Sequence, residues 1–207
     1  MREQKTACQK CSPCSLLSGW GGGGAFSDGK LNLTSDFGGN LTEYISEDEL
    51  DRLIHYVDRL YCQFGADDSI YGSSEEETEK IKKEAVKASL KFIPARIRHL
   101  GTEQCFTVLK NIYDYLNDKA EIRTDTEVVS IVKEDNEVLG IITTGGEYIK
   151  GKYIILSPGR VGAEWLKNQA IELELSVSRN PVDVGVRVEV PAVILEHLTD
   201  SLYESKL

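Results

Sequence analysis

The sequence predicts a mixed α/β fold, because helical and strand periodicities occupy different stretches of the chain. Between residues 46 and 116, apolar side chains recur at the spacing of helices that bury one face. Between residues 126 and 150, polar and apolar side chains alternate, which is typical of half-buried strands. Residues 153–156 are all apolar, a pattern expected of a strand buried on both faces in a parallel sheet.

The first expected helix has clear start and stop signals. Ser46 can cap it, Glu49 follows three residues later in a capping-box arrangement, and Gly65 ends it. Its apolar face is expected to contain Leu50, Leu53, Ile54, Val57, Leu60, Tyr61 and Phe64.

Two more helices are expected before residue 120. The second covers residues 74–92, with acidic residues first and lysines later as the helix dipole favours, and Pro94 terminates it. The third begins near Thr102 and places on one face Phe106, Leu109, Ile112, Tyr113 and Leu116.

A β-meander is expected next, because two tight-turn signals separate the alternating runs. The turn signals are Asp135-Asn136 and Gly145-Gly146. The three antiparallel strands are expected over residues 126–133, 137–144 and 147–150. After the buried strand we expect a helix over residues 161–168, a strand over 183–190 closed by Pro191, and a short helix near 192–198.

Composition limits the classes of function. The 207 residues suit one large domain or one and a half small ones, and 41% of them are hydrophobic, enough for a packed core. The net charge of −10 argues against nucleic acid and anionic membranes as partners. Because no apolar run reaches the ~20 residues of a membrane-spanning helix, and the polar start lacks a signal-peptide core, we expect a cytoplasmic protein.

The glycine-rich stretch GWGGGGAFSDGK could cradle a phosphate through its backbone N–H groups. A Walker loop fits at Gly24, Gly29 and Lys30 but fails at Leu31, where a magnesium-binding Ser or Thr is required. A Rossmann turn is equally unsupported, because no apolar strand precedes Gly19. Composition therefore leaves both a ligand loop and an ordinary connection open.

The cysteines also leave alternatives open. The odd count of five argues against a disulfide framework, and Cys62 and Cys105 stand singly in helical patterns. The other three, Cys8, Cys11 and Cys14, have metal-ligand spacing but no fourth cysteine nearby. A metal site, a redox pair beside a flavin and structural thiols are all conceivable, and we expect the last.

Four stretches together resemble one family. SGWGGGGAFSDGKLNL, preceded by CQKCSPC, is similar to a segment of the uncharacterised FAD-dependent dehydrogenases of the glutathione-reductase-like flavoprotein class. The helix before the meander in that family resembles GTEQCFTVLKNIYDYL. Its meander and the strand that returns to the FAD-binding sheet resemble TEVVSIV and GEYIKGKYIILSPGR. A strand that enters its substrate domain resembles VDVGVRVEVP.

The resemblance implies a partial FAD-binding domain of glutathione-reductase type with a three-stranded meander, followed by the start of a substrate domain. Family members open with a strand, a G-x-G-x-x-G turn and a helix that bind the FAD pyrophosphate, and this chain lacks that unit. We therefore expect an internal part of a longer protein. We expect four stretches. Residues 1–45 contain the cysteines and the glycine loop, and residues 46–120 are helical. Residues 121–160 form the meander and the returning strand of the FAD domain, and residues 161–207 begin the substrate domain.

By the same resemblance, the cofactor is contacted by the glycine loop, one meander residue and the turn after the returning strand. Lys30 stands either near flavin N1 or as a solvated lysine, and Asp28 either bonds the cofactor or caps a turn. The implied FAD-contacting residues are Gly21, Gly22, Gly23, Gly24, Ala25, Phe26, Ser27, Asp28, Gly29, Lys30, Val128, Ser157, Pro158, Gly159 and Arg160.

The function implied is that of an oxidoreductase that passes a hydride between an unknown small-molecule substrate and flavin. The alternative is a non-catalytic binding, interaction or metal-binding module that uses the glycine loop and the clustered cysteines. No catalytic residue is predicted, because the three histidines show no grouping with a nucleophile or acid. We expect FAD as the cofactor, no nucleic acid or membrane partner, and self-association through an exposed sheet edge.

Overall fold

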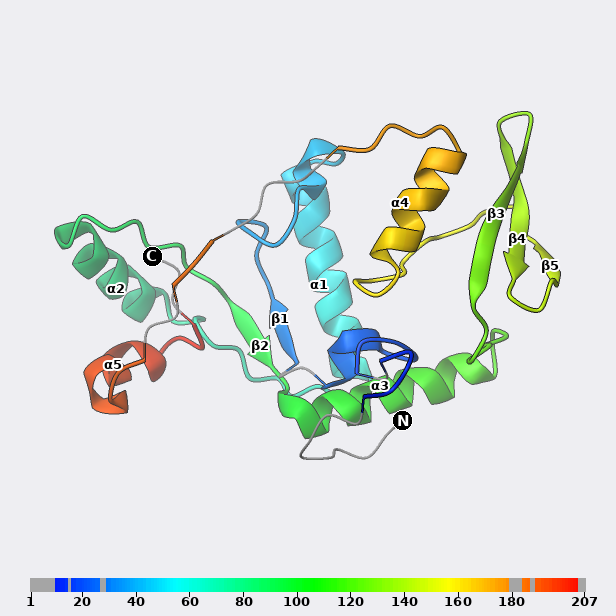
Figure 1. The fold of residues 1–207 in the computed structure, drawn as a ribbon. Coiled ribbons are helices and arrows are strands. Elements are labelled where there is room, and N and C mark those ends of the chain that lie inside the picture. Colours follow the sequence, from blue (N-terminus) through cyan, green and yellow to red (C-terminus); the bar gives the residue numbers. More distant parts are fainter. Residues whose placement is uncertain (1–9, 15, 27–28, 179–183, 187–188, 205–207) are drawn as a thin grey trace. The chain divides into compact units, whose positions relative to one another are not determined.

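The computed structural model describes residues 10–14, 16–26, 29–178, 184–186 and 189–204, and the chain divides into two compact units (Figure 1). The meander unit consists of Met1–Gly23 and Ala120–Gly185, and the helical unit consists of Gly24–Lys119 and Val186–Leu207. A short 3₁₀ turn, η1 (Gly22–Phe26), crosses the division. Helices and strands coexist as the sequence predicts.

The helical unit contains four α-helices and a small antiparallel pair of strands among its described residues. The helices are α1 (Glu47–Gln63), α2 (Glu75–Lys87), α3 (Gly101–Asn117) and α5 (Ala192–Thr199). The strands are β1 (Lys30–Asn32) and β2 (Ile97–His99), and a second 3₁₀ turn is η2 (Leu41–Glu43). All four helices were expected, whereas the two three-residue strands were not.

The helix starts follow the predicted capping chemistry. Ser46 Oγ accepts a hydrogen bond from the Glu49 backbone N at 3.2 Å, and Gly65 has a φ of +105° just past the end of α1. Ser74 caps α2 in the same way, through the Glu77 backbone N at 3.3 Å. These polar side chains satisfy N–H groups that the first helical turn leaves without partners.

The predicted end of α2 near residue 92 is wrong. The helix ends at Lys87, because Ser89 adopts a left-handed φ of +58°. The Leu90 backbone N then bonds back to the Ala85 carbonyl at 2.9 Å, a helix-ending arrangement. The chain has therefore left the helix before Pro94 can stop it.

The core of the helical unit is small. Ile81, Ala85, Phe92 and Leu202 form one buried cluster, against which Leu198 of α5 packs. Ile97 of β2 and Val108 of α3 are also fully buried. The C-terminal helix is thus attached to α2 by apolar contacts.

The meander unit contains the predicted three-stranded antiparallel sheet. Its order is β3 (Val128–Glu134), β4 (Glu137–Thr143) and β5 (Tyr148–Lys150). Asp135 and Asn136 have φ values of +47° and +72°, as a type I′ hairpin requires. At the second hairpin Gly146 has a φ of +78° and donates its backbone N–H to the Thr143 carbonyl. Both predicted turns are confirmed.

Helix α4 (Ala163–Glu172) packs on strand β3 and corresponds to the helix expected over residues 161–168. Gln169 is buried and its Oε1 accepts from the Ile131 backbone N at 2.7 Å. Trp165 Nε1 donates to the Val129 carbonyl at 3.0 Å. Two side chains of α4 therefore bind backbone groups of β3, which fixes the helix against the sheet.

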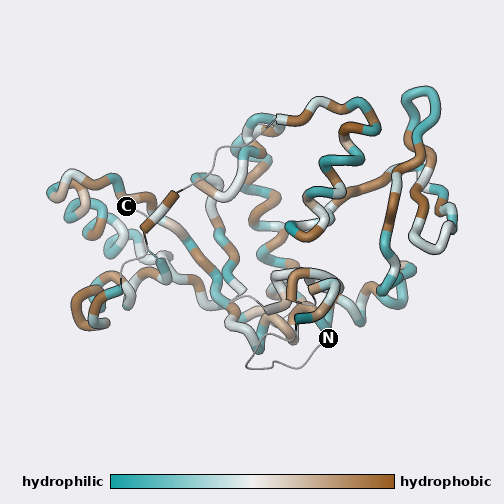
Figure 2. The backbone as a smooth tube through the Cα atoms, in the orientation of Figure 1, coloured by the Kyte–Doolittle hydropathy of each residue, from teal (hydrophilic) through white to brown (hydrophobic). Residues whose placement is uncertain are grey.

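The predicted buried strand over residues 153–156 is wrong. These residues form no strand, and Tyr153 and Ile155 are 82% and 91% exposed. Both sheets among the described residues are antiparallel, so the run has no parallel sheet to enter. Figure 2 shows this hydrophobic segment between the meander and α4.

The strand predicted over residues 183–190 is wrong in the part that can be compared. Residues 184–186 and 189–190 are not in a strand, and Val184 and Val186 are 94% and 89% exposed. Positions 183, 187 and 188 lie outside the described residues. As with the run at 153–156, an apolar pattern without a neighbouring strand cannot form a ladder.

No helix among the described residues is long and apolar enough to cross a membrane.

Candidate functional site

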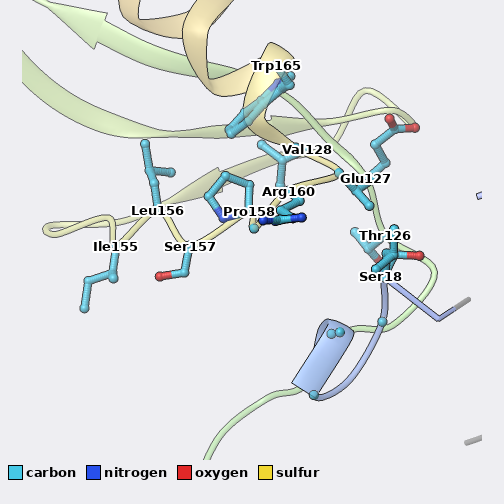
Figure 3. Close-up of a pocket in the computed structure, with 18 of the residues that line it drawn as sticks. Ser18, Thr126, Glu127, Val128, Ile155, Leu156, Ser157, Pro158, Arg160 and Trp165 are labelled. Carbon is cyan, nitrogen blue, oxygen red and sulfur yellow. The ribbon is translucent and has the colours of Figure 1, made fainter. Parts of the chain in front are cut away.

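A cleft with a volume of about 850 Å³ lies within the meander unit (Figure 3). It is built from the glycine loop, the start of β3, the segment between β5 and α4, and α4 itself. Its lining residues are Leu17, Ser18, Gly19, Gly21, Gly22, Gly23, Thr126, Glu127, Val128, Ile141, Ile154, Ile155, Leu156, Ser157, Pro158, Gly159, Arg160, Val161, Gly162 and Trp165.

The glycine loop has a backbone that suits a bound anion. Gly19, Gly21 and Gly22 have φ values of +90°, +76° and +51°, which side chains with a Cβ rarely adopt. A Cβ added at Gly19 or Gly22 would meet nothing within 4 Å, so space lies beside the backbone. Backbone with residues in this conformation can present N–H groups to an anion.

The segment before the loop is anchored by local hydrogen bonds. Ser18 Oγ donates to the Cys14 carbonyl at 2.7 Å, and the Leu17 and Ser18 backbone N–H groups bond to the same oxygen. The Gly22 N–H donates to the Gly19 carbonyl at 3.0 Å and closes the turn. The loop therefore enters the cleft with a defined backbone path.

The turn before α4 supplies the positive charge of the cleft. Arg160 is the one basic residue among the described lining residues, and it is exposed. Gly159 has a φ of +63°, and a Cβ at Gly162 would lie 2.4 Å from the Cβ of Pro158. Glycine is thus required at Gly162, the N-cap of α4, where no side-chain hydrogen bond caps the helix. A helix N-terminus and an arginine together favour a negatively charged group.

Part of the cleft lining is apolar. Val128, Ile141 and Leu156 line it together with the half-buried ring of Trp165. The hydrogen bond from Trp165 Nε1 to Val129 fixes the plane of that ring. A fixed aromatic face beside branched aliphatic side chains suits a flat heterocycle.

No family model and no curated protein matches this chain.

The cleft therefore has to be interpreted from its own geometry. It brings together predicted residues from three segments that are far apart in the sequence: Gly21, Gly22, Gly23, Val128, Ser157, Pro158, Gly159 and Arg160. The distribution of charge is simple, with Arg160 and Glu127 as the two ionisable side chains among the described lining residues. Such a site can bind a ligand that joins a planar ring to an anionic group.

Other predicted contacts belong to the helical unit. Ala25 is buried, and Gly29 lies so close to α3 that an added Cβ would be 2.8 Å from Leu100 Cβ. Gly24 accepts a hydrogen bond from Cys105 Sγ at 3.1 Å. Phe26 ends η1, and Ser27 and Asp28 lie outside the described residues.

Lys30 has a partner in the helical unit. Its Nζ forms an ion pair with Glu204, and both side chains are about three-quarters buried. This contact ties β1 to the segment after α5. The expectation that Lys30 stands near flavin N1 remains a prediction.

The clustered cysteines gain no metal partner among the described residues. Within that part of the chain, no group of three or more His, Cys, Asp or Glu side chains could hold an ion. Cys8 lies outside the described residues, and Cys11 and Cys14 are half-buried.

Sequence reasoning missed several lining residues, above all Trp165, Ser18, Thr126 and Glu127. Trp165 lies within a predicted helix. Its position shortly after the Ser-Pro-Gly-Arg turn is the sequence signal that could have indicated a lining residue. Ser18 precedes the glycine loop, and Thr126 and Glu127 are the first two residues of the predicted strand; they line the cleft only because the chain folds back on itself.

Proposed function

We propose that this chain supplies part of the FAD site of an FAD-dependent oxidoreductase that transfers a hydride between an unknown small-molecule substrate and flavin. One observation carries the proposal. Residues 21–23, Val128 and residues 157–160, which the resemblance assigns to one cofactor, line a single cleft of about 850 Å³. The glycine loop and the other two segments share this cleft although more than 100 positions separate them in the sequence.

The chemistry of the cleft supports a dinucleotide. The glycine loop, Arg160 and the start of α4 favour phosphate, whereas Trp165 and Val128 favour a planar ring. When bound, flavin supplies the redox chemistry, and the protein holds and orients it. We further propose a cytoplasmic protein without nucleic-acid or membrane partners, as its acidic composition suggests.

A fluorescence titration tests the proposal. Trp165 lines the cleft, and the other tryptophan, Trp20, is replaced by Phe so that one emitter remains. We expect FAD to quench this emission saturably, with ADP competing because it carries the same pyrophosphate. Arg160→Ala should weaken FAD binding by up to about fivefold, because Arg160 is exposed and a charge pair in contact with water contributes about 0–1 kcal/mol.

Arg123→Ala is the matched control. Arg123 belongs to the same unit, pairs with Glu121 and Glu147 and does not line the cleft, so its loss should leave FAD affinity unchanged. Absence of saturable quenching up to millimolar FAD would overturn the proposal and favour a flavin-independent binding module.

A further inference from the structure

Cys11 and Cys14 lie at the two ends of a short bend in the meander unit. The chain bends at both residues between them, Ser12 and Pro13, and these two residues are exposed. A disulfide joins α-carbons that are roughly 4.4–6.8 Å apart. Four residues that turn the chain bring their end α-carbons to within about 7 Å, whereas an extended stretch does not. The local backbone therefore suits a bond between these two thiols.

Both thiols are free and half-buried. Cys105 differs from them, because it is 5% exposed and its Sγ donates to the Gly24 carbonyl at 3.1 Å. A buried, hydrogen-bonded thiol is shielded from solutes, whereas a partly exposed thiol can react with them. The exposure of Cys11 and Cys14 therefore argues against the purely structural role that the sequence led us to expect.

The backbone of Cys14 holds the start of the glycine loop. Its carbonyl accepts hydrogen bonds from the Leu17 and Ser18 backbone N–H groups at 3.1 and 3.0 Å and from Ser18 Oγ at 2.7 Å. Leu17, Ser18 and Gly19 line the cleft. A change in the orientation of the Cys14 carbonyl would therefore alter the path of the loop into the cleft.

We propose that Cys11 and Cys14 form a redox-sensitive dithiol that controls the order of the glycine loop. Its oxidant is a low-molecular-weight disulfide, and the reaction is thiol–disulfide exchange. One thiolate attacks the small disulfide and releases one small thiol, and the second thiolate attacks the resulting mixed disulfide and releases the other. The protein loses two electrons and two protons, and the small disulfide takes them up and becomes two thiols.

Oxidation should loosen the glycine loop. The sulfur atoms of the two free thiols have to approach to the about 2.05 Å of an S–S bond. Because Cys11 and Cys14 are so close in the sequence, this approach rotates peptide groups of the bend, including the Cys14 carbonyl. A carbonyl that rotates loses its alignment with its hydrogen-bond donors. The reduced chain is therefore the form in which the Cys14 carbonyl anchors the loop.

Peptide mass spectrometry on the full chain tests the dithiol. The chain is equilibrated with mixtures of reduced and oxidised glutathione, and the remaining thiols are alkylated in denaturant. Trypsin cleaves after Lys10 and Lys30, so Cys11 and Cys14 lie on one peptide. As oxidised glutathione increases, this peptide should escape alkylation and become lighter by two hydrogens. The peptide that contains Cys62 is the control and should stay alkylated.

Cys8 lies on a different tryptic peptide and so distinguishes the proposed pair from other pairs. Cys8→Ser should leave oxidation of the pair unchanged, and Cys14→Ser should abolish it. A disulfide from Cys8 would join two peptides and overturn the proposal. Thiols that stay alkylated, or that carry only glutathione, at every ratio would overturn it as well.

Hydrogen exchange tests the effect on the loop without any cofactor. The Leu17 and Ser18 amides should exchange roughly twofold to tenfold faster in the oxidised chain, which is the effect of losing one hydrogen bond. The hairpin at Asp135-Asn136 belongs to the same unit and is the control, since its exchange should not change. The Cys11→Ser chain in oxidised glutathione should exchange like the reduced chain. Equal exchange of the loop in both redox states would contradict its control by the dithiol.

A second measurement rests on the proposed function. Equilibrium dialysis should show FAD binding roughly twofold to tenfold weaker in the oxidised chain, because the loop has lost its anchor. Absence of FAD binding in both redox states would overturn the proposed function, and hydrogen exchange would still decide on the dithiol. Equal FAD affinities with the disulfide formed would refute the control of the cleft.

Discussion

Arg98 carries its charge inside the helical unit. Its side chain is 4% exposed, and its Nε and Nη2 donate to the two carboxylate oxygens of Asp58 at 2.6 and 3.0 Å. Nη1 donates to the Asp67 carbonyl. The hydrogen bonds to Asp58 raise the pKa of Arg98, so the guanidinium stays charged. One buried arginine thereby joins β2 to α1 and to the loop after it.

Replacing Arg98 by Ala should lower the free energy of unfolding by about 3–5 kcal/mol. The loss is large because Asp58, whose side chain is 14% exposed, is left as a buried charge without its cation. Arg52→Ala is the control, because Arg52 pairs with Glu49 in solvent and should cost only about 0–1 kcal/mol. Urea unfolding followed by circular dichroism measures both. Equal losses would show that the buried pair contributes no more than an exposed one.

Cys62 of α1 should react slowly with thiol reagents near neutral pH. Burial raises the pKa of the Cys62 thiol, and Asp58 and Asp68 raise it further against the opposing effect of Arg98. The thiolate is the reactive form, and a raised pKa reduces its fraction at a given pH. The midpoint of its alkylation rate against pH, followed by peptide mass spectrometry, should lie above that of a free cysteine. A midpoint at or below that value would contradict the prediction.

At the scale of elements, Gly140 controls the contact between β4 and β5. A Cβ added there would lie 2.3 Å from the Ile149 carbonyl oxygen and 2.7 Å from the Tyr148 ring. Gly140→Ala should therefore destabilise the meander unit by about 1–3 kcal/mol, because backbone has to move. Gly145→Ala in the adjacent hairpin meets its nearest atom at 3.9 Å and should change stability by less than about 1 kcal/mol. Thermal unfolding measures the stability of the two variants. Similar melting temperatures for Gly140→Ala and Gly145→Ala would count against the close contact at Gly140.

Local signals in the sequence predicted the elements that local chemistry determines. The cap at Ser46 and the turn at Asp135-Asn136 act within a few residues, so the pattern was sufficient. The end of α2 was missed because the left-handed φ of Ser89 has no signature in residue type. The run at residues 153–156 was misassigned because an apolar pattern indicates that a segment could be a buried strand. It does not indicate whether a neighbouring strand is present to pair with it.

The candidate site was predictable to a similar degree. Glycines at Gly21 and Gly22 and the turn at Gly159 point to special backbone, and the structure gives all three a positive φ. Trp165 was missed as a lining residue because its place depends on how α4 packs on β3, a tertiary contact. Tertiary packing thus adds an aromatic side chain to a site whose unusual backbone could be predicted from its glycines.

At the scale of the whole molecule, the proposed dinucleotide site does not include the strand–turn–helix unit with which members of the resembled family bind the pyrophosphate. The cleft lies within the meander unit and includes Gly21, Gly22 and Gly23, whereas Gly24, Gly29 and Lys30 belong to the helical unit. The contacts implied for one cofactor are therefore distributed over both units of the chain.

We accordingly predict that the 207-residue chain binds FAD more weakly than micromolar. Arg160 and Ile155 are exposed in the cleft, so a bound pyrophosphate remains in contact with water, where each charged hydrogen bond contributes little. Ordering exposed lining backbone costs roughly 1–2 kcal/mol per residue, which offsets much of the remaining contact energy. A longer chain that adds a glycine turn at a helix N-terminus should bind tightly, because its N–H groups neutralise the phosphate charge. Equilibrium dialysis with FAD measures both affinities. Sub-micromolar binding to the monomeric 207-residue chain would mean that the cofactor contacts lie elsewhere.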